Sequence, residues 1–575
     1  MIYNKFLKTT ALVTGMMFTL AACGASDDTA KDQGLPTFSA ERIKDHMAYL
    51  ASDDMKGRDT GSEEYRMAAE YVADFYKGLG LKPAGENGTY FQEVPFKTTR
   101  IAQEESSLKV MDKIFAPDAV VFRTNTDSLE LIANGDLVFV GYGIHAPDMG
   151  HDDFAGVDVA GKIIVRLIGL PEGIAPEIAQ AYSSTQRRGL QGAKAVIDVS
   201  TPVFEETRFP FATLAGFFSG ERFELVGQNA ESDEAVEAAP AIEAIISAAG
   251  AQDLFAMTGS SLDAAMTEAA ATGFVAKPLN VSVDMKQVTY VDNSVTSPNV
   301  AAVLEGSDPV LKDQYVVISG HLDHVGDTCP HQPNDTAAED DTICNGALDN
   351  ASGTATLLEV AKAFAENATR PKRSVLFLNV TAEEKGLFGS EYYSNNPTLP
   401  VESLVANVNL DMPILFYDFA DVVAFGGEHS TIGETAAKAL AKINIAVAED
   451  PMPEERLFTR SDHFRFVQKG IPAVFLMTGP TAVGDDISLP PQEREGYKEF
   501  RKFLETNYHS PADDMHQPIM FDVAAKYALG NYLIIEALAN EEQEPRWYEG
   551  NTWGDQYAPG KPRAAAPVPM EAADE

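Results

Sequence analysis

The sequence predicts an α/β protein with a mixed, mostly parallel central sheet, helices on both faces of that sheet, and a smaller inserted β-rich α/β domain. Apolar strand-like runs alternate with helical segments between residues 299 and 540, as in parallel sheets built from βαβ units. Several runs end directly before histidine or acidic residues, where an open α/β sheet forms its binding crevice. The block over residues 116–283 has no dense group of such residues, so we expect it to be the insertion.

The composition limits the size of each core and the kind of partner. A chain of 575 residues is too long for one ordinary core, so two or more domains are expected. Hydrophobic residues make up 45% and charged residues 23%, as in globular proteins. The formal net charge of −42 would repel nucleic acids and anionic lipid surfaces, so neither is expected as a partner.

The first residues are typical of an export signal. Lys5 and Lys8 precede a short apolar run, so residues 1–22 are predicted to be a signal peptide, and residues 23–38 a flexible tether. The sequence Leu-Ala-Ala-Cys-Gly over residues 20–24 resembles the lipobox of bacterial lipoproteins. This resemblance implies acylation of Cys23 and a lipid anchor in a cell-envelope membrane (outer membrane or periplasmic face in a Gram-negative cell). The alternative is an ordinary cleaved signal with a chance cysteine.

Elements of the main domain begin before the insertion. Helical spacing of apolar residues predicts helices over 40–50, capped by Ser39, and over 63–79; alternation predicts a strand over 90–96. Residues 39–115 are therefore assigned to the first segment of the main domain. Residues 116–283 are assigned to the insertion, with predicted strands over 137–140 and 162–168, a further strand near residue 196, and a helical Ala-rich stretch over 230–273.

The second segment of the main domain spans residues 284–542. Apolar runs predict strands over 299–304, 315–319, 374–380, 405–410, 422–424 and 473–477. Helices are predicted over 351–365, 431–443 and 520–538. Residues 479–508 are predicted to be a long loop that leads to His509, and residues 543–575 an irregular or disordered tail.

The three cysteines indicate one disulfide. If Cys23 carries lipid, Cys329 and Cys344 remain as an even pair in an exported protein, where disulfides persist. A bond between them would close a loop of about 16 residues and stabilise the fold by about 3 kcal/mol. Two free thiols or a metal-binding pair are the alternatives.

A set of histidine and acidic side chains predicts a two-metal site. The five candidates are His321, Asp349, Glu384, Asp411 and His509. Two imidazoles and three carboxylates, one of which can bridge, suit two Zn²⁺ ions about 3.5–4 Å apart. Such a pair can bind and activate one water and polarise a carbonyl group.

Two further carboxylates complete the predicted chemistry. Glu383, beside the ligand Glu384, is the candidate general base that takes the proton of the water and returns it to a leaving amine. Asp323 is placed behind His321, where it can fix the imidazole ring. His324, His331, His463 and His516 are competing imidazoles that we place outside the ligand set.

The order of these motifs resembles the M28 family of zinc peptidases. The matching residues are His321-x-Asp323, Asp349-Asn350-x-Ser352-Gly353, Glu383-Glu384, Asp411 and the run Tyr-His-Ser-Pro-Ala-Asp over 508–513. The resemblance implies that His321 and Asp411 bind one zinc, Glu384 and His509 bind the other, and Asp349 bridges. Gly57-Arg58 resembles the start of the same domain, and residues 138–165 are similar to a protease-associated (PA) domain.

The resemblance implies an exported metallo-aminopeptidase that hydrolyses the N-terminal bond of peptide substrates. The segment between Asp323 and Asp349 is longer than is usual in the family, so we expect the disulfide loop to lie at the rim of the site and narrow the substrate pocket. A carboxypeptidase or a glutaminyl cyclase on the same fold, and a non-catalytic binding protein, are the alternatives.

Overall fold

The computed structural model describes residues 34–567, apart from 172, 186–189, 191, 209, 228–239, 272 and 333. The predicted signal peptide, Cys23 and most of the predicted tether lie outside these residues. Within the described part of the chain, every helix is too short or too polar to cross a membrane.

The main domain is built on the predicted mixed sheet. Its centre consists of four parallel strands in the spatial order β15 (Ser374–Val380), β14 (Tyr315–His321), β16 (Leu404–Leu410) and β19 (Ala473–Thr478). Antiparallel neighbours follow on both sides, namely β13 (Lys277–Leu304) next to β15 and β17 (Asp421–Phe425) next to β19; β18 (Ala446–Ala448) pairs with β17. The predicted fold class is confirmed.

Helices cover both faces of this sheet. Val316 and Ile318 of β14 belong to the core shared with α2 (Ala40–Leu50), α3 (Glu63–Gly78), α9 (Gly353–Glu366), α11 (Ile432–Leu440) and α14 (Phe521–Asn540). Val317 points to the other face, in a core that includes residues of α10 (Phe388–Asn395) and α12 (His463–Val467). Burial on both faces explains why these strands are continuous apolar runs in the sequence.

A second body carries its own sheet. Parallel strands β6 (Glu130–Phe139), β9 (Ile163–Leu167), β10 (Ala195–Val199) and β12 (Ile242–Ile246) lie side by side in this order, with β5 (Val120–Phe122) antiparallel to β12. The N-terminal half of β13 pairs with β6 and with β3 (Ser107–Val110), which pairs with β4 (Lys113–Phe115). The helices of this body are α4 (Pro176–Thr185), α5 (Pro202–Thr207), α6 (Phe211–Ser219), α7 (Ala248–Met257) and α8 (Leu262–Ala269). Its main core runs from Ile101 to Met285, while the boundaries 116 and 283 and the likeness to a PA domain stay predictions.

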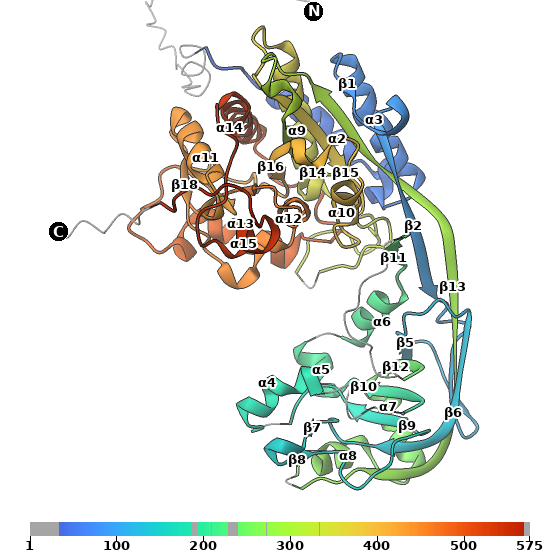
Figure 1. The fold of residues 1–575 in the computed structure, drawn as a ribbon. Helices are drawn as coiled ribbons and strands as arrows, with labels where there is room; N and C mark the ends of the chain where they lie inside the picture. The colour runs from blue at the N-terminus through green and yellow to red at the C-terminus, as the bar shows by residue number, and fades with distance from the viewer. Residues whose placement is uncertain are drawn as a thin grey trace, which may run out of the picture.

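Two long strands join the bodies. The C-terminal half of β13 is antiparallel to β2 (Phe91–Ile101), and Figure 1 shows the two strands running together from the upper to the lower body. Strand β1 (Lys82–Pro83) pairs with the end of β13. The sequence pattern identifies only the last residues of β13, because its middle alternates between exposed and buried side chains rather than forming an apolar run.

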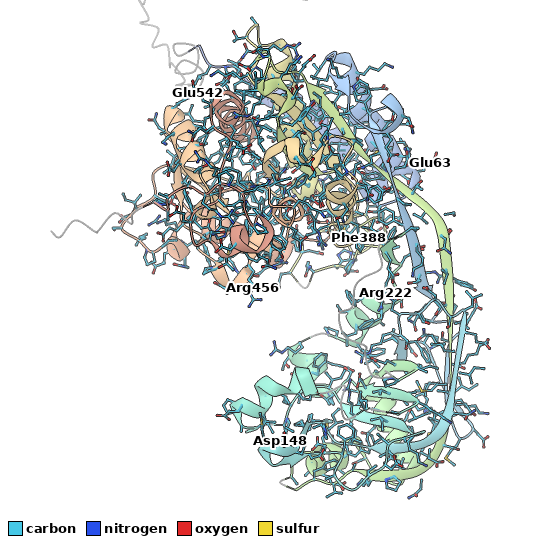
Figure 2. All side chains as sticks on the ribbon, viewed as in Figure 1. Glu63, Asp148, Arg222, Phe388, Arg456 and Glu542 are labelled. Carbon is cyan, nitrogen blue, oxygen red and sulfur yellow. A yellow bond between two sulfur atoms is a disulfide. The ribbon has the colours of Figure 1, made fainter. Side chains whose placement is uncertain are left out.

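A small apolar cluster lies where the bodies meet. Phe96 of β2 packs edge-on against Phe223 of β11 (Arg222–Leu225), with ring centroids 5.4 Å apart. The ring centroids of Phe96 and Phe388 are 6.3 Å apart. Ala382 belongs to the same cluster. In Figure 2, the labelled Arg222 and Phe388 mark this junction. The second body therefore contacts the residues next to Glu383.

Three sequence expectations are wrong in part. Residues 230–273 are not simply helical, because strand β12 precedes helices α7 and α8; residues 230–239 lie outside the described part of the chain. The expected loop 479–508 contains α13 (Glu495–Thr506), whose charged residues outnumber its buried phenylalanines. The expected irregular tail contains α15 (Thr552–Tyr557), and Trp547 is buried and donates its indole N–H to the carbonyl oxygen of Gly470 at 3.1 Å.

Candidate metal centre

Three adjacent parallel strands deliver polar side chains to one edge of the sheet. His321 is the last residue of β14 and lies opposite Val380 of β15, after which Glu383 and Glu384 follow within a few residues. Asp411 directly follows β16. Because the strands are parallel and in register, residues far apart in the sequence meet at the carboxyl edge of the sheet.

Asp349 comes from the turn that leads into α9, and its backbone is tightly held. The carboxylate of Asp513 accepts hydrogen bonds from the backbone N–H groups of Leu348 at 2.9 Å and Asp349 at 3.0 Å. The Asn350 side chain donates to the carbonyl oxygen of Leu410 at 2.9 Å, which ties this turn to the end of β16.

The glycine before this turn is required by close packing. Gly346 has a φ of +62°, and a Cβ there would overlap the backbone oxygen of Asp349 and lie 2.6 Å from the His324 ring. Any side chain would therefore displace both the turn and the ring.

The carboxylate of Asp349 lies between two imidazole–carboxylate pairs. Its Oδ1 is 3.2 Å from Nε2 of His321, and that nitrogen is also 3.2 Å from Oδ1 of Asp411. Its Oδ2 is 3.3 Å from Nε2 of His509, which is 3.0 Å from Oε2 of Glu384. The structure thus brings all five predicted ligands together, with one oxygen of Asp349 turned to each pair.

A sixth side chain joins this cluster. Nδ1 of His324 lies 2.7 Å from Oε1 of Glu384 and 3.9 Å from Oδ2 of Asp349, and the ring is fully buried. His324, Asp349, Glu384 and His509 each offer a ligand atom, and these atoms lie within 4.8 Å of one another. His324 was predicted to lie outside the ligand set; its position three residues after His321, beyond the same strand end, was the signal that could have placed it here.

The buried carboxylates of the cluster require compensating positive charge. Burial and Glu384 act to raise the pKa of Asp349, but the hydrogen bonds with His321 and His509 outweigh them and lower it to about 2. Burial disfavours a charged His509, but the carboxylates of Glu384 and Asp349 outweigh it and raise the pKa of His509 to about 10. Protons on the imidazoles or bound divalent cations can supply the charge, and this mixture of nitrogen and oxygen donors fits Zn²⁺.

Asp323 holds the loop that carries Glu383 rather than the imidazole ring. Its Oδ1 accepts the backbone N–H of Glu383 at 3.2 Å, and its Oδ2 accepts that of Glu384 at 3.3 Å. Thr60 donates its hydroxyl to Oδ2 at 3.2 Å. The His321 ring is 3.2 Å from the backbone oxygen of Asp323 and 3.9 Å from its carboxylate, so its N–H partner is the backbone.

Residues outside the predicted ligand set also contact the cluster and its loops. Arg58 is buried and donates to the backbone oxygens of Leu322 at 3.0 Å and Asn345 at 2.6 Å, so it fixes the chain on both sides of the disulfide loop. Ser461 donates its hydroxyl to Oδ2 of Asp411 at 2.7 Å. The partners of Arg58 and Ser461 were not predicted, because a Gly-Arg pair in a turn and a serine before a short helix are common in loops.

The disulfide loop touches the segment that carries His509. Cys329 and Cys344 form the predicted disulfide, with their Cα atoms 5.4 Å apart, so the pairing is confirmed. The Gln332 side chain donates to the backbone oxygen of Tyr508 at 3.0 Å, and the Tyr508 ring stacks on the His509 imidazole with centroids 3.8 Å apart. The loop therefore lies beside the metal-ligand cluster.

Comparisons with known proteins match the segment that carries the candidate ligands. Residues 299–530, which include all five candidate ligands and Glu383, match the model of Peptidase family M28. The chain is 30% identical over 237 residues to the probable leucine aminopeptidase 2 of Aspergillus fumigatus, a match covering 39% of this chain and 42% of that protein. It is 29% identical over 195 residues to leupeptin-inactivating enzyme 1 of Streptomyces exfoliatus, covering 33% and 38%.

The matches to curated relatives are partial. The chain spans less than half the length of these two proteins. Among solved structures, the aminopeptidase from Aneurinibacillus sp. strain AM-1 is 20% identical, with a TM-score of 0.49, over 88% of this chain and 95% of that chain.

The shared position of Asp349 predicts unequal effects of ligand substitutions on zinc content. Asp349→Asn removes the charge that both pairs share, so the purified protein should fall from about two zinc ions per chain to well below one. Asp411→Asn should leave about one ion, because the other pair keeps Glu384 and His509. Zinc would be counted by plasma mass spectrometry after dialysis.

The matched control is Asp421→Asn, because Asp421 of β17 is a buried aspartate that accepts a hydrogen bond from Thr481. Equal zinc losses in Asp349→Asn and Asp411→Asn would contradict a shared ligand.

Proposed function

We propose that this protein is a zinc-dependent aminopeptidase that removes the N-terminal residue from peptides, with two Zn²⁺ ions held by His321, Asp349, Glu384, Asp411 and His509. The observation that carries the proposal is the Asp349 carboxylate, with one oxygen toward each of two imidazole–carboxylate pairs. The match of the surrounding segment to an M28 peptidase model and the names of the relatives support peptides as substrates.

The reaction follows from what the residues around Asp349 can do. Bound divalent cations supply Lewis acidity, which lowers the pKa of water and polarises a peptide carbonyl. One oxygen of Glu383 lies within 4.8 Å of ligand atoms of His321 and Glu384, and we place this carboxylate outside the ligand set, as the group that handles the proton. It accepts the proton of the attacking water as the new C–O bond forms, and passes it to the amine as the C–N bond breaks.

The other residues hold this geometry. The Asp323 carboxylate fixes the backbone of Glu383 and Glu384 together, so the base and its neighbouring ligand keep a constant separation. Asp513 does the same for the Asp349 turn. Such second-layer hydrogen bonds keep ligands oriented and typically affect metal affinity or activity by about 10–100-fold when they are removed.

Glu383→Gln tests the base and the reaction together. The amide keeps the size of the side chain but cannot take a proton, so kcat should fall by about 10²–10⁴-fold while the zinc content stays that of the natural protein. The assay uses peptides with a free amino terminus, with chelation and zinc add-back as the control for metal dependence. Unchanged turnover in the variant would contradict the assigned role.

The same peptides separate the alternative reactions. An aminopeptidase should cleave peptides with a free N-terminus whether the C-terminus is free or amidated, and should leave N-acetylated peptides intact. Cleavage that requires a free C-terminus would instead show a carboxypeptidase, and loss of ammonia from N-terminal glutamine a glutaminyl cyclase. Zinc binding without turnover of any of these substrates would favour a non-catalytic binding protein.

We also propose that the chain is exported and anchored through lipid on Cys23. The support is the Leu-Ala-Ala-Cys-Gly sequence after a charged and then apolar segment, together with a disulfide between Cys329 and Cys344. Growth of an expressing bacterium with labelled palmitate should label the natural protein and not Cys23→Ser. Equal labelling of both, or labelling of neither, would contradict the anchor.

A further inference from the structure

The second body contains a cavity of about 280 Å³ that is separate from the metal centre. It is lined by residues of the parallel strands β9, β10 and β12 and of helices α4, α5 and α6. Figure 1 shows these elements grouped in the lower body, with β14, β15 and β16 in the upper one. The volume is near the lower end of the roughly 300–1,000 Å³ range of small-molecule sites, which suits a ligand the size of one or two amino acids.

An ion-pair network forms the polar part of this cavity. Arg166 of β9 lies opposite Asp198 of β10 in the parallel register. Its Nε and Nη2 both donate to the Asp198 carboxylate, the latter at 3.2 Å. Arg123 donates Nη2 to Oδ2 of Asp198 at 2.5 Å and lies 2.8 Å from Oε2 of Glu243. The Asp198 carboxylate therefore accepts hydrogen bonds from two guanidinium groups.

Each of these arginines keeps one buried nitrogen without an acceptor. Nη1 of Arg166 and Nε of Arg123 have no hydrogen-bond partner among the described residues, although both atoms are buried. Only 8% of the Arg166 surface is exposed. Leaving a buried charged donor unpaired is costly, so an anion in the cavity that draws these side chains toward it would be bound favourably.

The charges around the cavity favour an anion. Arg123 and Arg222 both lie against the Phe218 ring, with guanidinium carbons 6.0 and 5.8 Å from its centroid. Arg123, Arg166 and Asp198 line the cavity, while Arg222 and Glu243 lie just outside its lining; together these groups carry three positive and two negative charges. Burial, and then the like charge of Arg123, lower the pKa of Arg222. This positive surplus stands out in a chain whose formal net charge is −42.

The rest of the lining is apolar. Phe204 of α5 and Leu214 and Phe218 of α6 face the cavity opposite the strands. A ligand that matches this lining combines an anionic group for the arginines with an apolar group for the aromatic and aliphatic walls.

We propose that this cavity binds a carboxylate that carries an apolar side chain, with its carboxylate held by the guanidinium groups of Arg166 and Arg123. Two sources have this chemistry, namely a free apolar amino acid and the C-terminal residue of a peptide. The proposal stands on the second body alone and does not depend on the metal centre or on its proposed activity.

Isothermal titration calorimetry of the zinc-loaded full-length protein tests the proposal. L-leucine represents the free amino acid, and N-acetyl-L-leucine represents a peptide C-terminus without a free amine. N-acetyl-L-leucinamide has the same side chain without a carboxylate and, like N-acetyl-L-leucine, has no free amine for the proposed aminopeptidase to act on. We expect saturable binding of L-leucine, N-acetyl-L-leucine or both, and at least about tenfold weaker binding of N-acetyl-L-leucinamide. Binding of N-acetyl-L-leucine identifies a peptide C-terminus as an accepted ligand, and binding of L-leucine alone that is lost in Leu214→Trp identifies the free amino acid.

Two variants assign the binding to the cavity. Arg166→Gln removes the unpaired donor and should weaken carboxylate binding by about tenfold or more. Leu214→Trp fills the cavity without removing an ion pair, so it should abolish binding. It provides a second test in case Arg166→Gln folds poorly. Val203→Ser, an exposed position of α5, is the matched control and should bind normally. The proposal is overturned if neither carboxylate binds, if N-acetyl-L-leucinamide binds as well as N-acetyl-L-leucine, or if Leu214→Trp binds like the natural protein.

Discussion

The carboxylate of Asp349, shared between two imidazole–carboxylate pairs, is the interaction on which the rest of the candidate site depends. His321 with Asp411 and His509 with Glu384 come from different parts of the chain, and Asp349 is the group that lies within 3.3 Å of both imidazoles. Holding so many acidic groups in one buried cluster is unfavourable unless positive charge offsets them. The site therefore has a clear electrostatic requirement for cations, and its donors are those that zinc prefers.

The sheet topology makes this arrangement possible. Strands β14, β15 and β16 are parallel and end at one edge, so their first residues beyond the strands converge. The backbone then fixes the side chains that the strands do not place. Asp513 holds the Asp349 turn, Asp323 holds the Glu383–Glu384 loop, and Arg58 joins the loops that flank the disulfide.

Much of this could be predicted from the sequence, because the strands are buried on both faces and end at polar residues. His321, Asp349, Glu384, Asp411 and His509 stand out as ligand-type residues at such places, and the structure brings them together. His324 could not be assigned in this way, since the direction of its ring depends on how the chain turns after β14 and packs on Gly346. The hydrogen bonds that Asp323 accepts from the backbone of Glu383 and Glu384 could not be predicted either, because backbone N–H groups leave no trace in a sequence.

The parts of the fold that were missed share a physical cause. Helix α13 is highly charged and buries only one narrow side, and Trp547 is held by a contact with Gly470 from a distant part of the chain. Strand β13 serves two sheets, and its exposed middle section lacks the apolar pattern that marks its end. In each case tertiary contacts, rather than local pattern, determine the structure.

Anomalous diffraction at the zinc absorption edge, from crystals of the zinc-loaded protein, tests the shared Asp349 carboxylate most directly. We predict two zinc peaks about 3.5–4 Å apart, one on each side of Asp349, with Oδ1 facing the ion bound by His321 and Oδ2 facing the ion bound by His509. A single peak, or two peaks of which only one contacts Asp349, would contradict it.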